Sequence, residues 1–246
     1  MHFKRGKIFP GWIVLGACAF VVFGVAGTQF SFGVFLKPML EDYGWSRASL
    51  ATAFGVTFLL AGLLRPLAGY IADHHSPKLV ALSGVVLMAV MLLVLPYVNN
   101  LLQLYYIFAV MSIGITLAAG PTLAKVVSSW FHQQRGVAFG VLTGGGSAGG
   151  LILVPAASAV LVLSSWEAAY QFLALLLFVV VVPLGLFLIR NRPEDMGLRA
   201  MGDPGDVPGG EEGTSDRSKG VAVPDATIRE AIGSPFFWKL TFGYFV

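Results

Sequence analysis

The feature that most constrains this chain is the length of the segments that contain no charged residue. The longest of them runs from Leu79 to Ala124. Because an α-helix crosses the hydrocarbon core of a bilayer in about 20 residues, this segment is long enough for two crossings. Only 12% of the residues are charged and 56% are hydrophobic, whereas soluble domains carry about 25% charged residues. The sequence therefore predicts an all-α membrane protein, since helices satisfy their own backbone hydrogen bonds in lipid.

Six transmembrane helices account for the charge-free segments. A turn is predicted within the longest segment at residues 96–100, where Pro96 and two asparagines interrupt the apolar residues. Ser46 precedes the second helix and is a candidate N-cap. The first apolar segment exceeds the about 7–15 residues of a signal peptide core, so we expect it to be retained as a helix. The helices are expected within residues 11–35, 48–71, 79–95, 101–127, 136–166 and 168–189.

The basic residues of the short loops predict the orientation of the helices. Cytoplasmic loops carry an excess of Lys and Arg. With the N-terminus inside, the outer face receives only Lys37 and Arg47, and the inner face receives Lys4, Arg5, Lys7, Lys78, Arg135, Arg190, Arg192 and Arg199. We therefore expect an integral protein of the plasma (inner) membrane whose N-terminal tail, residues 1–10, is cytoplasmic. Because these cations lie at the ends of apolar segments and form no single patch, a nucleic-acid partner is not expected.

The composition changes at the end of the sixth expected helix. The bundle is predicted to occupy residues 11–190, and residues 191–235 are predicted to be a cytoplasmic linker. Much of that linker is rich in Gly, Pro, Asp and Glu, with too few large apolar residues to offset the entropy of ordering. Residues 236–246 are aromatic and apolar but too few to span a bilayer. We interpret them as the truncated start of a seventh helix.

Six helices are consistent with an internal 3+3 repeat in which the first and fourth helices correspond. Each of these carries a potential interruption near its middle, at residues 24–27 (Gly-Val-Ala-Gly) and at Gly120-Pro121. Paired interruptions of this kind point to the binding site of a transporter. The fifth helix contains several glycines, whose small size favours close helix packing. A second interpretation is that they let this helix slide against another bundle.

The turn after the second helix carries the most specific local motif. Gly69 and Asp73 lie four residues apart and share one helix face, and Lys78 follows the turn. This segment resembles the signature Gly-x-x-x-Asp-Arg-x-Gly-Arg-Arg/Lys of the major facilitator superfamily, with His74, Ser76 and Pro77 as departures. The resemblance implies a conformational latch between two halves of a transporter, in which Asp73 would act with Arg135 or Lys78. The alternative is an ordinary polar helix end.

Three further segments are similar to one branch of that superfamily. Residues 130–140 resemble the Trp-Phe…Arg-Gly-x-Ala-x-Gly loop of monocarboxylate and oxalate/formate-type facilitators, and residues 44–47 and 192–197 fit the same branch. The resemblance implies alternating access of two six-helix bundles around a midplane site. One departure concerns residues 28–31, Thr-Gln-Phe-Ser, which lack the lysine of proton-linked animal monocarboxylate carriers. A coupling proton is therefore not supported by these residues.

Candidate substrate contacts are the ionisable and polar residues that lie within the apolar segments. Charges inside a membrane are costly and usually functional. Arg65 lies roughly 12 Å before Asp73 along its helix, where it could bind an anionic substrate or act in gating. Lys125 lies near a helix end, where it could bind substrate or extend to the headgroups. The polar candidates either line a cavity or bond their own helix carbonyls; they are Thr28, Gln29 and Thr116.

These observations predict a secondary transporter of small solutes, such as organic anions of the monocarboxylate type. No cofactor or metal site is expected, because Cys18 is the only cysteine and the four histidines do not combine with it or with carboxylates into a ligand set. No motif predicts an enzyme. A six-helix half lacks one wall of the substrate cavity, so we expect it to pair with a missing C-terminal half or with another copy. The alternative is a non-transporting membrane scaffold or an inactive fragment of such a transporter.

Overall fold

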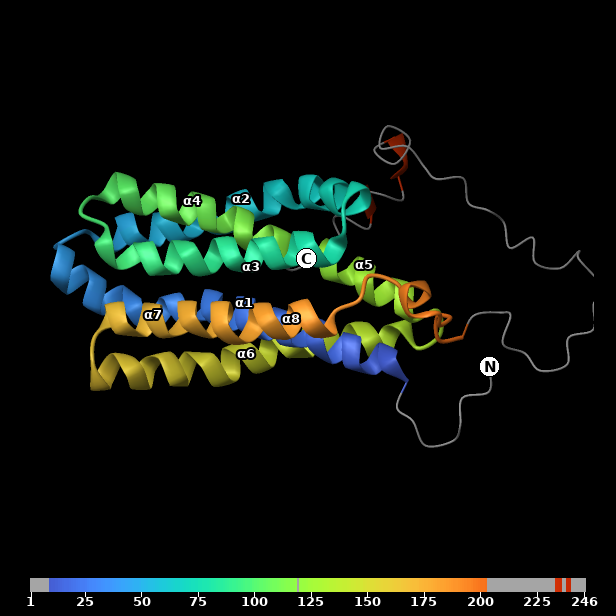
Figure 1. The fold of residues 1–246 in the computed structure, drawn as a ribbon. Coiled ribbons are helices and arrows are strands. Elements are labelled where there is room, and N and C mark those ends of the chain that lie inside the picture. The colour runs from blue at the N-terminus through green and yellow to red at the C-terminus, as the bar shows by residue number, and fades with distance from the viewer. Residues whose placement is uncertain (1–8, 119, 203–232, 236–237, 240–246) are drawn as a thin grey trace, which may run out of the picture. The chain divides into compact units, whose positions relative to one another are not determined.

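The computed structural model describes residues 9–118, 120–202, 233–235 and 238–239. The chain divides into two compact units, Met1–Pro204 and Gly205–Val246. All the helices discussed below belong to the first unit, in which antiparallel helices form a bundle (Figure 1). Among the described residues, six helices are long and apolar enough to cross a membrane. The predicted all-α membrane fold with six spans is therefore confirmed, and the 3+3 repeat remains a prediction.

The first three spans are α1 (Pro10–Tyr43), α2 (Arg47–His74) and α3 (Pro77–Val94), the last continued by a 3-10 turn (Leu95–Tyr97). Ser46 caps α2 as predicted, because its hydroxyl accepts a hydrogen bond from the Ser49 amide at 3.0 Å. Ser76 caps α3 in the same way through the Leu79 amide. Each serine occupies a turn between spans, where free amides at a helix start need an acceptor.

The fourth span consists of α4 (Leu101–Ala118) and α5 (Pro121–Trp130). The fifth is α6 (Arg135–Leu163), and the sixth is continuous through α7 (Trp166–Leu175), a π-helical segment (Leu176–Val181) and α8 (Val182–Leu188). The predicted turn at residues 96–100 is present, and the Asn100 side chain accepts a hydrogen bond from the Gln103 amide at 2.8 Å at the start of α4. The predicted seventh helix, residues 236–246, lies largely outside the described residues.

The two predicted helix interruptions differ in outcome. The fourth span is broken where expected, since Gly120 has a positive φ of 66° and Pro121 begins α5. The first span is not broken, because α1 runs without interruption through Gly24 and Gly27. Proline and a left-handed glycine end a helix, whereas glycine alone only lowers helix propensity. The proposed pairing of two broken helices is therefore wrong.

The glycines of α1 serve close packing against α6 instead. A methyl group added at Gly149 would overlap the Phe23 carbonyl oxygen, and one added at Gly27 would lie 2.7 Å from the Gly149 carbonyl oxygen. No side chain fits at such contacts, so the two backbones touch directly. Small residues allow this approach, which is a common basis of helix association in membranes. The packing interpretation of the glycines in the fifth span is thus supported at Gly149.

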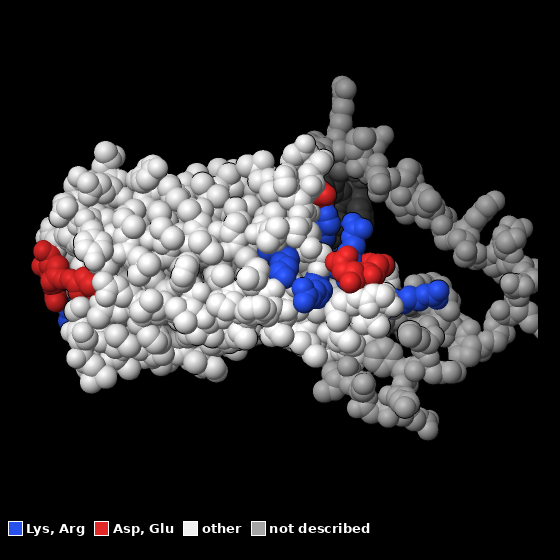
Figure 2. Space-filling model, in the orientation of Figure 1, with Lys and Arg blue, Asp and Glu red and all other residues white. Residues whose placement is uncertain are grey.

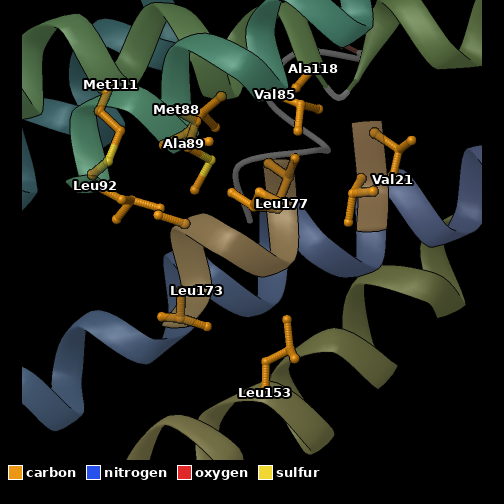
Figure 3. Close-up of a cluster of buried hydrophobic side chains, with 14 of the residues drawn as sticks. Val21, Val85, Met88, Ala89, Leu92, Met111, Ala118, Leu153, Leu173 and Leu177 are labelled. Atoms are coloured by element: carbon orange, nitrogen blue, oxygen red, sulfur yellow. The ribbon is translucent and has the colours of Figure 1, made fainter. Parts of the chain in front are cut away.

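Apolar side chains fill the space between the six spans. Figure 3 shows a cluster of buried side chains that includes Leu177 of the π-helical segment, Val21 of α1, Val85 and Met88 of α3 and Met111 of α4. All five of these side chains are buried. The core therefore joins the first, third, fourth and sixth spans into one unit.

The segment after α8 returns to the bundle. The Trp130 indole donates a hydrogen bond to the Arg190 carbonyl at 3.0 Å, and the Ser129 hydroxyl donates one to the Asn191 carbonyl at 2.9 Å. Further along, the Met201 carbonyl accepts hydrogen bonds from the His132 and Gln133 amides. The first compact unit thus extends to Pro204, beyond the expected end of the bundle at residue 190.

Candidate functional site

A small cavity inside the bundle contains two of the predicted substrate contacts, Thr28 and Gln29 of α1. Thr28 is buried, and its hydroxyl has no hydrogen-bond partner among the residues that the structure describes. Gln29 is half-buried. A buried hydroxyl without a partner is costly, and it is available to a ligand that offers a donor or an acceptor. The other lining residues are Phe32, Phe54, Thr57, Met88, Leu92, Phe108, Met111, Ile115 and Tyr170.

Two polar residues of this cavity, Thr57 and Tyr170, did not emerge from the sequence. The Thr57 hydroxyl lies 3.3 Å from the Ala53 carbonyl and 3.4 Å from the Phe108 carbonyl, so it already has partners on α2 and α4. Tyr170 of α7 is fully buried beside Phe35, with ring centroids 4.1 Å apart. Neither residue stands in a motif, and only the packing of α2 and α7 around α1 brings them to the cavity.

Aromatic rings form one wall of the cavity. Phe32 stacks on Phe54 with ring centroids 4.2 Å apart, and it meets Phe108 edge-on at 5.2 Å. These rings come from α1, α2 and α4. The cavity therefore combines a mostly apolar wall with a few polar groups. Its volume in this structure is about 10 Å³, well below the about 300–1,000 Å³ of small-molecule sites.

Thr116 lies in α4, the helix that supplies Phe108, Met111 and Ile115 to the cavity lining, but its hydroxyl forms hydrogen bonds outside the cavity. Its hydroxyl lies 2.7 Å from the Ser112 carbonyl of its own helix and 3.2 Å from the Ala61 carbonyl of α2. Its hydrogen-bonding capacity therefore connects α4 to α2. The structure does not bring Thr116 together with Thr28 and Gln29 in this cavity.

Arg65 is placed on an exposed part of α2. Within residues 9–118 and 120–202, no hydrogen bond or ion pair engages its guanidinium group. An arginine in a membrane span usually faces a partner, a bundle interior or a water-filled cavity. Its side chain is therefore available to a group outside the described bundle.

Asp73 and Lys125 form an ion pair between α2 and α5. The Lys125 amine lies 2.7 Å from the Asp73 carboxylate and also donates to the Ala72 carbonyl at 2.9 Å. The Lys125 and Asp73 side chains are 39% and 65% exposed. The sequence instead suggested Arg135 or Lys78 as partners of Asp73. In this structure the Asp73 carboxylate pairs with Lys125 of α5, and a joint gating function of Asp73 with Arg135 or Lys78 remains a prediction.

The remaining residues of the predicted latch have separate contacts. The Arg135 Nε donates to the Phe131 carbonyl at 2.9 Å, and the Lys78 amine donates to the Leu186 carbonyl. Gly69 has open space beside it in the described bundle. Figure 2 shows that charged side chains on the visible face gather at the two ends of the bundle. The described residues thus place Asp73, Lys125, Lys78 and Arg135 at the end that carries the α2–α3 turn.

The chemistry available here is binding by hydrogen bonds, charge and apolar contact. The described residues contain no group of three or more His, Cys, Asp or Glu side chains that could hold a metal ion. The one cysteine, Cys18, is buried in α1. The described residues thus form a helical bundle with six candidate membrane spans, one of them broken, and an ion pair at one end.

The chain belongs to the Major Facilitator Superfamily, whose family model matches residues 18–246. It is 28% identical over 74% of its length to an uncharacterized MFS-type transporter, YcxA, of Bacillus subtilis (strain 168), of which it covers 45%. It is 23% identical over 98% of its length to the oxalate:formate antiporter of Oxalobacter formigenes, of which it covers 53%. It is also 23% identical over 65% of its length to monocarboxylate transporter 12 of Xenopus laevis, of which it covers 35%.

The solved structures show the same fold. A bacterial homologue of the human lysosomal transporter Spinster, in an inward-facing and unoccupied conformation, matches 97% of this chain with a TM-score of 0.65 and 16% identity. The chain covers 52% of that protein and about half or less of the three curated relatives just described. The suspected family is therefore confirmed, and the chain corresponds in extent to about half of a facilitator.

Proposed function

We propose that this chain forms one half of a secondary transporter of small organic anions that works by alternating access. The observation that carries the proposal is the match to the oxalate:formate antiporter along 98% of this chain. The similarity to a monocarboxylate transporter favours the same substrate class. Because the chain spans about half of the antiporter, the proposal requires a second six-helix unit, either a C-terminal half or another copy. No coupling proton is assigned.

Arg65 supports an anionic substrate in this proposal. It is the one cation in the middle part of α2, far from the ion pair at the end of the helix, and it has no partner among the described residues of the bundle. An arginine guanidinium binds carboxylates in a two-pronged geometry. Thr28 and Gln29 would contribute hydrogen bonds in a conformation in which the internal cavity, about 10 Å³ in this structure, is wider. Lys125 is better assigned to gating, because Asp73 occupies its amine.

Alternating access would use the charged end of the bundle as a gate. Asp73 and Lys125 connect α2 to α5, directly after the break in the fourth span. A pair that is partly exposed forms and separates at low cost. We propose that it closes this end of the bundle in one conformation and opens in another, with Gly69 offering open space for a second bundle to approach.

Uptake of labelled formate, oxalate and lactate tests this function. The chain would be co-reconstituted into proteoliposomes with a second six-helix unit, and Arg65→Gln would be compared with Arg65→Lys. We expect anion uptake in the wild type, a loss of about 10-fold or more in Arg65→Gln, and partial recovery in Arg65→Lys, since a charged hydrogen bond contributes about 1.5–3 kcal/mol. Arg47→Gln, at the first turn of α2, is the matched control.

Two outcomes would contradict the proposal. Unchanged uptake in Arg65→Gln would remove this residue from the substrate path. Absence of anion uptake by the wild type with every second unit tried would favour the alternative function, a non-transporting scaffold or an inactive fragment.

A further inference from the structure

A second pocket lies at the end of the bundle that carries the α2–α3 turn, apart from the internal cavity. It has a volume of about 300 Å³ and is lined by Lys78, by Met196 and by four further residues after α8. Those residues are Ile189, Arg190, Asn191 and Asp195. No step of the proposed transport cycle uses this pocket.

The pocket holds two cations whose charges are not neutralised within the bundle. Lys78 is half-buried, and its amine donates only to the Leu186 carbonyl, an uncharged group. Arg190 is exposed, and only its backbone carbonyl is engaged, by Trp130. The ion pairs of the described residues are Lys37–Glu41 and Asp73–Lys125, so neither cation has a carboxylate partner there.

Hydrogen bonds connect the polar groups around the pocket to one another. The Asn191 side chain accepts from the Lys78 amide at 2.9 Å and donates to the Ser76 hydroxyl at 2.8 Å. The Asp195 carboxylate accepts from the Arg192 amide at 3.3 Å. Lys78 and Arg190 are thereby held at one site although they lie on different spans of the chain.

The surroundings of the pocket point to a lipid as the occupant. Leu79 follows Lys78 in the chain, and Leu186 and Phe187 shortly precede Ile189; these large apolar residues are 59%, 45% and 72% exposed. They lie within or at the end of candidate membrane spans, where acyl chains would cover them. A free anion in solution would use the cations but not this apolar surface. Basic pockets between transmembrane helices bind anionic lipid headgroups.

We propose that this pocket binds the phosphate headgroup of an anionic phospholipid, with Lys78 and Arg190 as the phosphate contacts. The acyl chains would lie along Leu79, Leu186 and Phe187. Asp195 also lines the pocket and opposes an anion there, so it limits the affinity. In the expected orientation the lipid belongs to the cytoplasmic leaflet. Its binding would hold the start of α3 and the end of α8 together.

Native mass spectrometry of the purified full chain tests the proposal by measuring retained phosphatidylglycerol against phosphatidylcholine. We expect the wild type to retain phosphatidylglycerol preferentially. Loss of one cation, in Lys78→Gln or Arg190→Gln, should weaken phosphatidylglycerol binding about fivefold, and loss of both should weaken it about 30-fold. Arg199→Gln is the matched control, because it removes an exposed cation near this end of the bundle that does not line the pocket.

Further variants separate the lipid from other ligands. Asp195→Asn should increase retention of phosphatidylglycerol; a decrease, together with preference for phosphatidylethanolamine, would overturn the anionic class. Displacement of the lipid by millimolar inorganic phosphate would identify a site for a soluble anion and overturn the lipid proposal. Equal retention of phosphatidylglycerol by the Lys78→Gln/Arg190→Gln double variant and by Arg199→Gln would also overturn the lipid proposal. Lys78→Arg keeps the charge and should retain binding, and a wild-type melting temperature for Lys78→Gln would show that its loss of binding is not caused by unfolding.

Discussion

At the scale of single residues, the internal cavity contains two threonines in opposite situations. The Thr28 hydroxyl is buried without a described partner, whereas the Thr57 hydroxyl lies within hydrogen-bond distance of two carbonyls. An unpartnered polar group destabilises a fold and a partnered one stabilises it. This contrast makes Thr28, and not Thr57, the candidate for a ligand contact, and the two variants below test that assignment.

Replacement of these threonines by valine should therefore have opposite effects on stability. We expect Thr28→Val to stabilise the bundle by about 1 kcal/mol and to weaken anion uptake, and Thr57→Val to destabilise it by about 0.5–1.5 kcal/mol. Thermal unfolding of each purified variant in detergent measures the first effect and proteoliposome uptake the second. A destabilised Thr28→Val with normal uptake would contradict a ligand-binding function for Thr28.

The Asp73–Lys125 pair provides a second test at this scale. Asp73→Lys or Lys125→Asp alone should reduce transport several-fold by placing like charges together, and the exchanged pair should recover much of it. The melting temperature should change little in the exchanged pair, because both side chains are partly exposed. Glu41→Gln is the control, since it removes the more exposed ion pair with Lys37 near the C-terminal end of α1. Failure of the exchange to recover transport would argue against a gating function.

At the scale of helices, the glycines of α6 differ in their surroundings. Some contact α1, and others face open space. Gly149 has the Phe23 carbonyl where a methyl group would lie, whereas Gly144 has open space. Gly149 therefore cannot accept a side chain unless the helices separate. Gly144 leaves a smooth exposed strip on α6, where a second bundle could approach.

Alanine at Gly149 and at Gly144 should have different effects on the stability of the chain. We expect Gly149→Ala to destabilise the chain by about 1–3 kcal/mol, because an overpacked helix contact shifts the backbone. Gly144→Ala should leave stability unchanged or raise it by less than about 1 kcal/mol, since alanine favours the helix. Thermal unfolding in detergent measures both. Equal melting temperatures for the two variants would contradict the direct backbone contact.

The sequence predicted the helices better than their contacts. The length of the charge-free segments and the Ser46 cap located the spans. Both signals depend on residues that are near one another in the sequence. Gly120-Pro121 correctly indicated a helix break, whereas Gly24 and Gly27 did not. The sequence does not distinguish a glycine required for helix packing from a glycine that ends a helix. The partner of Asp73 and the Thr57 and Tyr170 contacts depend on how the spans assemble, which no local pattern records.

At the scale of the whole molecule, six antiparallel spans require successive turns to lie on opposite sides of the bilayer. His75, after α2, and Asn99, after α3, are exposed residues in successive turns. In a Cys18→Ala background, we expect Asn99→Cys to react with an impermeant maleimide applied outside intact cells. His75→Cys should react only after permeabilisation. Labelling of both sites from the same side would contradict the six-span arrangement.

The backbone of Met201 is bonded to Trp130 as well as to His132 and Gln133. The chain is therefore attached to the bundle at two places after α7: at the end of the sixth span and again at Met201. A mechanical load on that polypeptide would act first on the corner between α5 and α6, next to the helix that carries Lys125. Residues up to Met201 and the corner between α5 and α6 would therefore be displaced together.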